Sequence, residues 1–179
     1  GVGKSSFMKK ISKEFNKMGY DVELHYCSSD PSSLDGIVIK ELNVVMIDAT
    51  APHTVDPKTP GAIDEILNFG EFWDVEKIEQ NRDKIKACNE DISECFQRAF
   101  RFLKSAEPIY IEVESKISKC IDLSKLSKVT DEFLEKIFAD VEFNGKKAYV
   151  RHLFGSAITP IGYLDYSDSL FDGVENIYY

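Results

Sequence analysis

The chain has 179 residues, of which 43% are hydrophobic and 30% charged, and this composition predicts a folded domain with a sizeable core. No apolar run approaches the roughly 20 residues that a membrane span requires, so no membrane partner is expected. Asp and Glu number 31 against 22 Lys and Arg, and the net charge of −9 disfavours nucleic acid as a partner. The four cysteines form no CxxC pair and indicate free thiols in a cytoplasmic protein.

The first predicted element is a helix over residues 5–18, where apolar residues recur at three- and four-residue steps. Gly19 is expected to end this helix. Residues 21–26 alternate as a strand does, and residues 27–34 (CSSDPSSL) have the composition of a loop. The β-branched apolar run of residues 43–48 (NVVMID) is typical of a strand covered on both faces in a parallel sheet. This succession of elements predicts an α/β core.

Residues 51–61 contain several prolines and are expected to form a loop. Beyond Trp73 the pattern indicates a long amphipathic helical arm, with a kink or break near Pro108. Thr130 is a candidate N-cap for a further helix that runs to Phe138. The seven-residue series that defines the arm consists of Ile78, Ile85, Ile92, Ala99, Ala106, Val113 and Cys120, with Phe96, Leu103, Tyr110 and Ile117 on the same face.

The chain begins with Gly1-Val2-Gly3-Lys4-Ser5-Ser6, which matches the second half of a Walker A loop, G-x-x-x-x-G-K-[ST]. Glycines let backbone N–H groups turn toward phosphate oxygens, and the helix that follows directs its positive N-terminus at the same anion. All six residues are therefore predicted to bind a nucleotide. Within them, Lys4 is expected to reach the β- and γ-phosphates and Ser5 to bind Mg²⁺.

Asp48 ends an apolar strand, as the Walker B carboxylate that positions Mg²⁺ does. The competing interpretation is an aspartate that caps the next turn. We favour the metal interpretation because the Walker A-like and Walker B-like patterns occur together in one chain and support each other. Ala49 stands where many ATPases have an acidic residue that activates water, and this favours a kinase or a slow hydrolase over a motor ATPase.

Several further side chains are candidates for catalysis. Asp30 follows the first predicted strand and is a possible proton acceptor, although an Asx-type turn before Pro31 is the interpretation that its local sequence favours. His53 is a candidate for contacting the γ-phosphate or orienting water, against the alternative of an ordinary loop residue. Asp35 and Asp56 are weaker candidates. The four arginines, Arg82, Arg98, Arg101 and Arg151, are candidates for stabilising charge, and Arg98 and Arg101 fit a polar face of the arm equally well.

The chain resembles a group of bacterial proteins that carry two P-loop NTPase halves in tandem and are generally described as ATPases or ATP-binding proteins. The strings that carry the resemblance are GVGKSSFMKKI, DVELHYCSSDPSSLDGIVI, VVMIDATAPHTVDPKTPGAIDEI, ISECFQRAF and RHLFGSAITPIGYLDYSDSL. The resemblance implies that Gly1, Gly3, Lys4 and Ser5 form the phosphate and Mg²⁺ site, with Asp48 as the Walker B carboxylate. It also implies that the chain is one repeat period, starting inside the first Walker A loop and stopping before the second.

The predicted fold is an α/β P-loop NTPase-type parallel sheet, with its first strand missing from the N-terminus and with a long helical insertion. Residues 1–73 are expected to form a partial P-loop NTPase core, and residues 74–142 are expected to form the helical arm or insertion. Residues 143–179 are expected to return to the core and to begin a second P-loop half. Within the last segment, residues 148–153 and 176–179 have strand-like sequence. We hypothesise that the last three residues either pair into the position of the missing strand or remain frayed.

The sequence thus predicts an Mg²⁺-dependent P-loop NTPase whose cofactors are ATP, or another nucleoside triphosphate, and Mg²⁺. One alternative is a small-molecule kinase with Asp30 as its base. The other alternative is a nucleotide-binding switch whose helical arm docks a protein partner.

Overall fold

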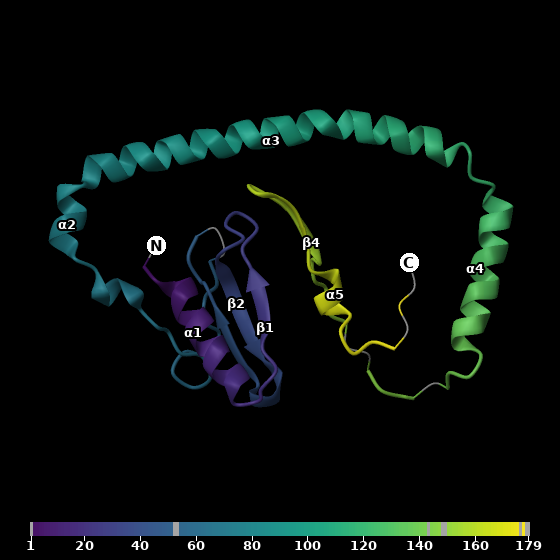
Figure 1. The fold of residues 1–179 in the computed structure, drawn as a ribbon, viewed down its shortest axis with the longest axis horizontal. Coiled ribbons are helices and arrows are strands. Elements are labelled where there is room, and N and C mark those ends of the chain that lie inside the picture. Colours follow the sequence, from purple (N-terminus) through teal and green to yellow (C-terminus); the bar gives the residue numbers. More distant parts are fainter. Residues whose placement is uncertain (1, 52–53, 143, 148–149, 176, 178–179) are drawn as a thin grey trace. The chain divides into compact units, whose positions relative to one another are not determined.

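The computed structural model describes residues 2–51, 54–142, 144–147, 150–175 and 177. The chain divides into two compact units. Unit 1 consists of Gly1–Asp74 and Arg151–Tyr179, and unit 2 consists of Val75–Val150. Figure 1 shows the helices and strands of both units in chain order.

Unit 1 begins with helix α1 (Lys4–Lys17), close to the predicted bounds of 5–18. Gly3 precedes it with a φ of 91°, a left-handed conformation that glycine adopts without steric cost. At the other end, Gly19 has a φ of 88° and follows the last helical residues, as predicted. The amphipathic pattern therefore located this helix correctly.

A three-stranded sheet follows, made of β1 (Glu23–Tyr26), β2 (Leu34–Ile39) and β3 (Val44–Ile47) in the order β1-β2-β3. Helix α1 lies against this sheet and contacts β2 most (Figure 1). Strand β2 is the most buried, and Ile37 and Ile39 are fully inaccessible to solvent. The small core between helix and sheet consists of Met8, Leu34 and Ile37, with Ile11, Val22 and Met46 packed against it.

The predicted P-loop NTPase-type parallel sheet is wrong, because every strand pair in the described residues is antiparallel. The predictions for β1 and β3 were close to their observed bounds, but β2 between them was missed. A parallel pair needs a crossover connection of a dozen or more residues, and β2 occupies the segment that such a crossover would use. Three of the four residues of β3 are exposed, so this strand is also not covered on both faces.

The second part of unit 1 contains a hairpin of β4 (Ser156–Thr159) and β5 (Gly162–Asp165), followed by the short helix α5 (Ser167–Leu170). The Tyr166 ring stacks on Tyr26 of β1 with ring centroids 5.3 Å apart. The Arg151 guanidinium pairs with the Glu23 carboxylate, also on β1. These contacts place the hairpin segment and the first sheet in the same unit.

Two sequence predictions fall near this hairpin. Residues 150–153 do not form a strand, since β4 begins only at Ser156, and residues 148–149 lie outside the described part of the chain. Of the predicted strand at 176–179, the structure describes Ile177 alone. Ile177 belongs to no strand, and for residues 178–179 the hypothesis of pairing into a missing-strand position lies outside the described residues.

The loop that leaves β3 contains no helix or strand over residues 54–61, as predicted, and residues 52–53 are outside the described ranges. Two short 3₁₀ helices, η1 (Lys40–Leu42) and η2 (Phe69–Phe72), complete unit 1. Phe69 of η2 contacts Phe7 of α1 edge to face, with centroids 5.5 Å apart. The chain is thus anchored to α1 before it enters unit 2.

Unit 2 contains α2 (Val75–Gln80), α3 (Arg82–Ser118) and α4 (Leu123–Phe138). The helical arm is therefore present, but α3 continues through Pro108 instead of breaking there. A proline removes one intrahelical N–H, and the helical turns on both sides persist without it. Thr130 is not an N-cap: α4 starts earlier, where the Asp122 carboxylate accepts hydrogen bonds from the backbone N–H groups of Ser124 and Lys125.

Candidate functional site

The Walker A-like residues lie at the N-terminus of α1. Gly3 is the N-cap and Lys4 the first helical residue, and the Gly3 carbonyl accepts the backbone N–H of Phe7 at 2.9 Å. The first backbone N–H groups of a helix have no partner within the helix and carry its positive dipole end. The first turn of α1, which is described throughout, has no acidic side chain. The first turn of α1 therefore contributes no carboxylate that would repel an anion at this end.

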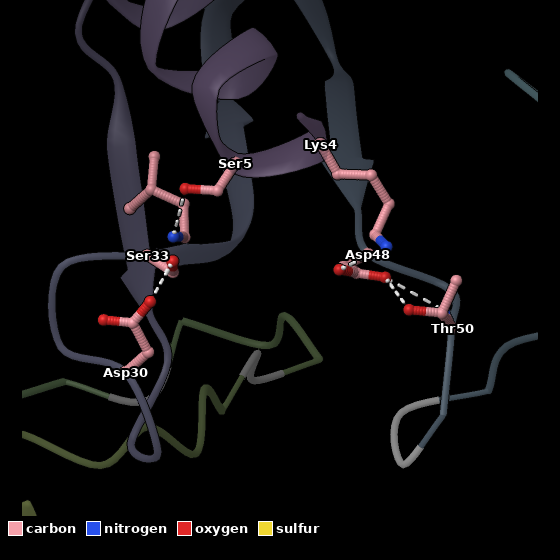
Figure 2. A network of polar contacts seen from close by, with 7 residues as sticks. Lys4, Ser5, Asp30, Ser33, Asp48 and Thr50 are labelled. Carbon is pink, nitrogen blue, oxygen red and sulfur yellow. Dashed lines mark hydrogen bonds and ion pairs between the residues drawn. The ribbon is translucent and has the colours of Figure 1, made fainter. Parts of the chain in front are cut away.

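Asp48 directly follows β3 and lies next to Lys4. The distance between Lys4 Nζ and Asp48 Oδ2 is 3.5 Å, and the two side chains are 28% and 20% exposed (Figure 2). Backbone contacts fix the position of Asp48, because its N–H donates to the Asp35 carbonyl at 2.8 Å. The fold thus brings together two predicted site residues that are far apart in the sequence.

Thr50 holds the Asp48 carboxylate in place. The Thr50 hydroxyl donates to Asp48 Oδ1 at 2.6 Å, and the Thr50 N–H donates to the same oxygen at 2.9 Å (Figure 2). Partial burial raises the pKa of Asp48, but these hydrogen bonds and the Lys4 ammonium together hold that pKa below its usual range. Asp48 is therefore an anion at neutral pH, as a metal ligand must be. Asp48 therefore caps the next turn, which is the interpretation that competed with the metal ligand, and Thr50 is the partner that the sequence analysis did not name.

Ser5 connects α1 to the start of β2. Its Oγ accepts the backbone N–H of Leu34 at 2.9 Å. A hydroxyl oxygen has two lone pairs, so this bond leaves one of them for a metal ion. In Figure 2, Lys4 and Ser5 point to different neighbours, Lys4 to Asp48 and Ser5 to the segment around Ser33.

Asp30 lies in the turn between β1 and β2. Its Oδ1 accepts the N–H of Ser32 at 3.1 Å and the Ser32 hydroxyl at 2.6 Å, while its Oδ2 accepts the Ser33 hydroxyl at 2.6 Å. This is the Asx-type turn that the sequence offered as the alternative to a catalytic role. The hydrogen bonds from Ser32 and Ser33 lower the pKa of Asp30, which makes it a weaker proton acceptor.

Of the other predicted site residues, Asp35 contacts Asp48 through its backbone carbonyl. Val2, Ser6 and Asp56 are exposed, and Gly1 and His53 lie outside the described residues. The Arg151 side chain pairs with Glu23, a carboxylate that also pairs with Lys40 and His25. The remaining arginines, Arg82, Arg98 and Arg101, belong to α3 of unit 2.

The donor set of the site fits a magnesium ion only in part. Among the described residues, no group of three or more His, Cys, Asp and Glu side chains could hold a metal ion. Mg²⁺ is commonly bound through one or two carboxylates, with substrate phosphates and water completing its coordination. Ser5 and Asp48 supply oxygen atoms of the required kind. The cysteines are free thiols, as predicted, and none of the described helices has the length and apolar character of a membrane span.

No protein-family model, curated protein or solved structure matches this chain. The similarity to tandem P-loop proteins therefore stays a prediction from sequence strings. The geometry around Lys4 and Asp48 is an independent observation.

Proposed function

We propose that this chain binds the Mg²⁺ complex of a nucleoside triphosphate, with ATP the expected nucleotide, and hydrolyses it. The observation that carries the proposal is the contact of Lys4 with Asp48 at the N-terminus of α1. It places a cation, a carboxylate and the positive end of a helix at one location. The proposal needs no parallel sheet, because it depends on these local groups alone.

Local charge supports an anionic ligand. The chain as a whole carries a net charge of −9, which repels phosphates on average. Helix α1 has the opposite balance, with five lysines and a single acidic residue, Glu14. A triphosphate would therefore find its most favourable local potential beside this helix. Lys4, at the first helical position, is the lysine placed to contact phosphate oxygens together with the backbone N–H groups.

The Lys4–Asp48 pair also predicts a dependence on the metal. Without Mg²⁺, the Asp48 carboxylate neutralises Lys4 and repels phosphate oxygens. When Mg²⁺ is bound, Asp48 would hold it and the ion would offset the negative charge of the carboxylate and the phosphates, which would leave Lys4 free to contact the phosphates. Ser5 would provide a further oxygen. Nucleotide binding is accordingly expected to be weak in a chelator and strong with Mg²⁺.

Hydrolysis is better supported than phosphate transfer to a small molecule. The kinase alternative uses Asp30 as its base, and hydrogen bonds from Ser32 and Ser33 occupy both oxygens of that carboxylate. In a hydrolase, positioning and charge stabilisation account for most of the catalysis, so a strong base is not essential.

Calorimetry on the 179-residue chain tests the proposal, with ATP and GTP titrated in the presence of Mg²⁺ and of EDTA. Lys4→Ala is expected to weaken Mg²⁺–ATP binding at least tenfold, because it removes a charge-assisted hydrogen bond. Lys10→Ala is the matched control, since it deletes an exposed lysine from the same helix. Phosphate release is measured in the same samples and is expected to require no added acceptor.

The proposal is wrong if folded wild-type chain binds neither nucleotide, or if Lys4→Ala and Lys10→Ala bind equally. Binding without phosphate release would refute the hydrolase part. Phosphate transfer that depends on an added acceptor would favour the kinase.

A further inference from the structure

Helix α3 carries a continuous apolar face that the rest of its unit leaves exposed. The face consists of residues spaced seven apart from Ile85 to Val113, and of a second series from Phe96 to Ile117. We call it the apolar seam. Its members are far from buried: Ile85 is 42% exposed, Phe96 44% and Leu103 52%. Two apolar series sustained over several heptads are typical of a helix that pairs with another helix.

The other helices of unit 2 are too short to cover this seam. At 1.5 Å per residue, the 37 residues of α3 extend about 55 Å, whereas the 16 residues of α4 extend about 24 Å. Helix α4, folded back against α3, would therefore cover less than half of it and leave Ile85 and Ile92 exposed. The six residues of α2 are shorter still. A partner that matches the full seam must have a helix of similar length.

We propose that this partner is α3 of a second copy of the chain, paired antiparallel about a two-fold axis at the level of Arg101. In this register, residues whose numbers add to 202 lie opposite each other. The first series of the seam from Ile85 to Ala106 then faces the second series, and Val113 faces Asn89. The pairing involves unit 2 alone and does not rest on the proposed nucleotide site.

Side-chain size supports the antiparallel register. Phe96 of one copy lies opposite Ala106 of the second copy, and Leu103 lies opposite Ala99 of the second copy. Large residues facing small ones let two helices interdigitate without voids. A parallel, in-register pair would instead place Ala99 opposite Ala99 and Ala106 opposite Ala106, and such alanine layers leave cavities that destabilise a core.

Charge complementarity supports the same orientation. Lys86 and Glu114 both flank the seam on the same side. In the antiparallel register, Lys86 of one copy lies beside Glu114 of the second copy, and the two-fold axis repeats this pair. In a parallel pair, Lys86 would instead face Asn81 and Glu114 would face Ile109. Only the antiparallel arrangement therefore gives these two charges partners of opposite sign.

Sedimentation velocity on the full chain, over a range of concentrations, tests the pairing. The expected mass of the dimer is about 41 kDa, twice the 20.3 kDa of one chain. Lys86→Glu and Glu114→Lys are each expected to raise the dimer dissociation constant about tenfold, since each places like charges together at two symmetric positions. The double variant restores opposite charges and is expected to return the constant to within about threefold of wild type.

Lys104→Glu is the matched control, because it makes the same charge change next to Leu103 but on the side of α3 away from the seam. Circular dichroism on every variant shows whether the helices persist, so loss of pairing is distinguished from loss of structure. A chain that stays at 20.3 kDa at all concentrations would overturn the proposal, including the case in which α4 folds back on α3. A dimer that responds equally to Lys86→Glu and Lys104→Glu, or that the double variant does not restore, would overturn the antiparallel register.

Discussion

Replacing Ser5 by alanine is expected to destabilise unit 1 through one hydrogen bond. The Leu34 N–H donates to Ser5 Oγ at 2.9 Å, and Leu34 is only 2% exposed. In Ser5→Ala this N–H has no acceptor at that position, and a buried unsatisfied donor costs about 1–3 kcal/mol. The better helix propensity of alanine returns up to about 0.5 kcal/mol. The net loss in the free energy of unfolding is therefore about 0.5–3 kcal/mol.

Urea and thermal unfolding measure this loss, with fluorescence of Trp73, the single tryptophan, as the reporter of unit 1. In a unit of about 100 residues, the expected loss lowers the melting temperature by roughly 2–24 °C. Ser6→Ala is the matched control, because it removes a hydroxyl from the adjacent, exposed position of the same helix. If Ser5→Ala and Ser6→Ala unfold within about 0.3 kcal/mol of each other, the hydrogen bond to Leu34 does not stabilise the fold and the reasoning fails.

Two further predictions concern the core and the acid limit of stability. Ile37→Ala is expected to lower the free energy of unfolding in urea by about 2–5 kcal/mol, because Ile37 is fully buried. Val45→Ala is the control, since Val45 is 60% exposed. Equal losses in the two variants would contradict the assigned core. The lowered pKa of Asp48 stabilises the folded state above the unfolded value of about 4, and this contribution is lost as pH falls through the folded pKa. The stability difference between wild type and Asp48→Asn should therefore shrink between pH 7 and 3 in urea titrations, and a constant difference would argue against a stabilised carboxylate.

The helices could largely be predicted from the sequence because their signals are local. Apolar spacing located α1 within one residue at each end, and Gly19 marked its end through a backbone conformation that glycine adopts readily. The same spacing identified the long helical arm. Some local signals misled, as at Pro108, where the predicted break does not occur, and at Thr130. Thr130 looked like an N-cap, yet Asp122 supplies the cap and Thr130 lies inside α4.

The sheet could not be predicted in the same way, since strand pairing is a relation between distant segments. Strands β1 and β3 were recognised, but their direction depended on β2, whose short sequence LDGIVI did not stand out. With β2 in place, tight connections make both neighbouring pairs, β1–β2 and β2–β3, antiparallel, and the parallel-sheet prediction fails.

The sequence by itself determined which residues the proposed phosphate site uses, because Gly3, Lys4 and Ser5 are contiguous and lie at the start of a helix. Only the tertiary structure brought Asp48 to within 3.5 Å of Lys4 and gave its carboxylate the hydrogen bonds of Thr50. The physical reason is that chain-local preferences fix φ, ψ and helix caps, whereas contacts across the sequence depend on how strands pair and which faces become buried.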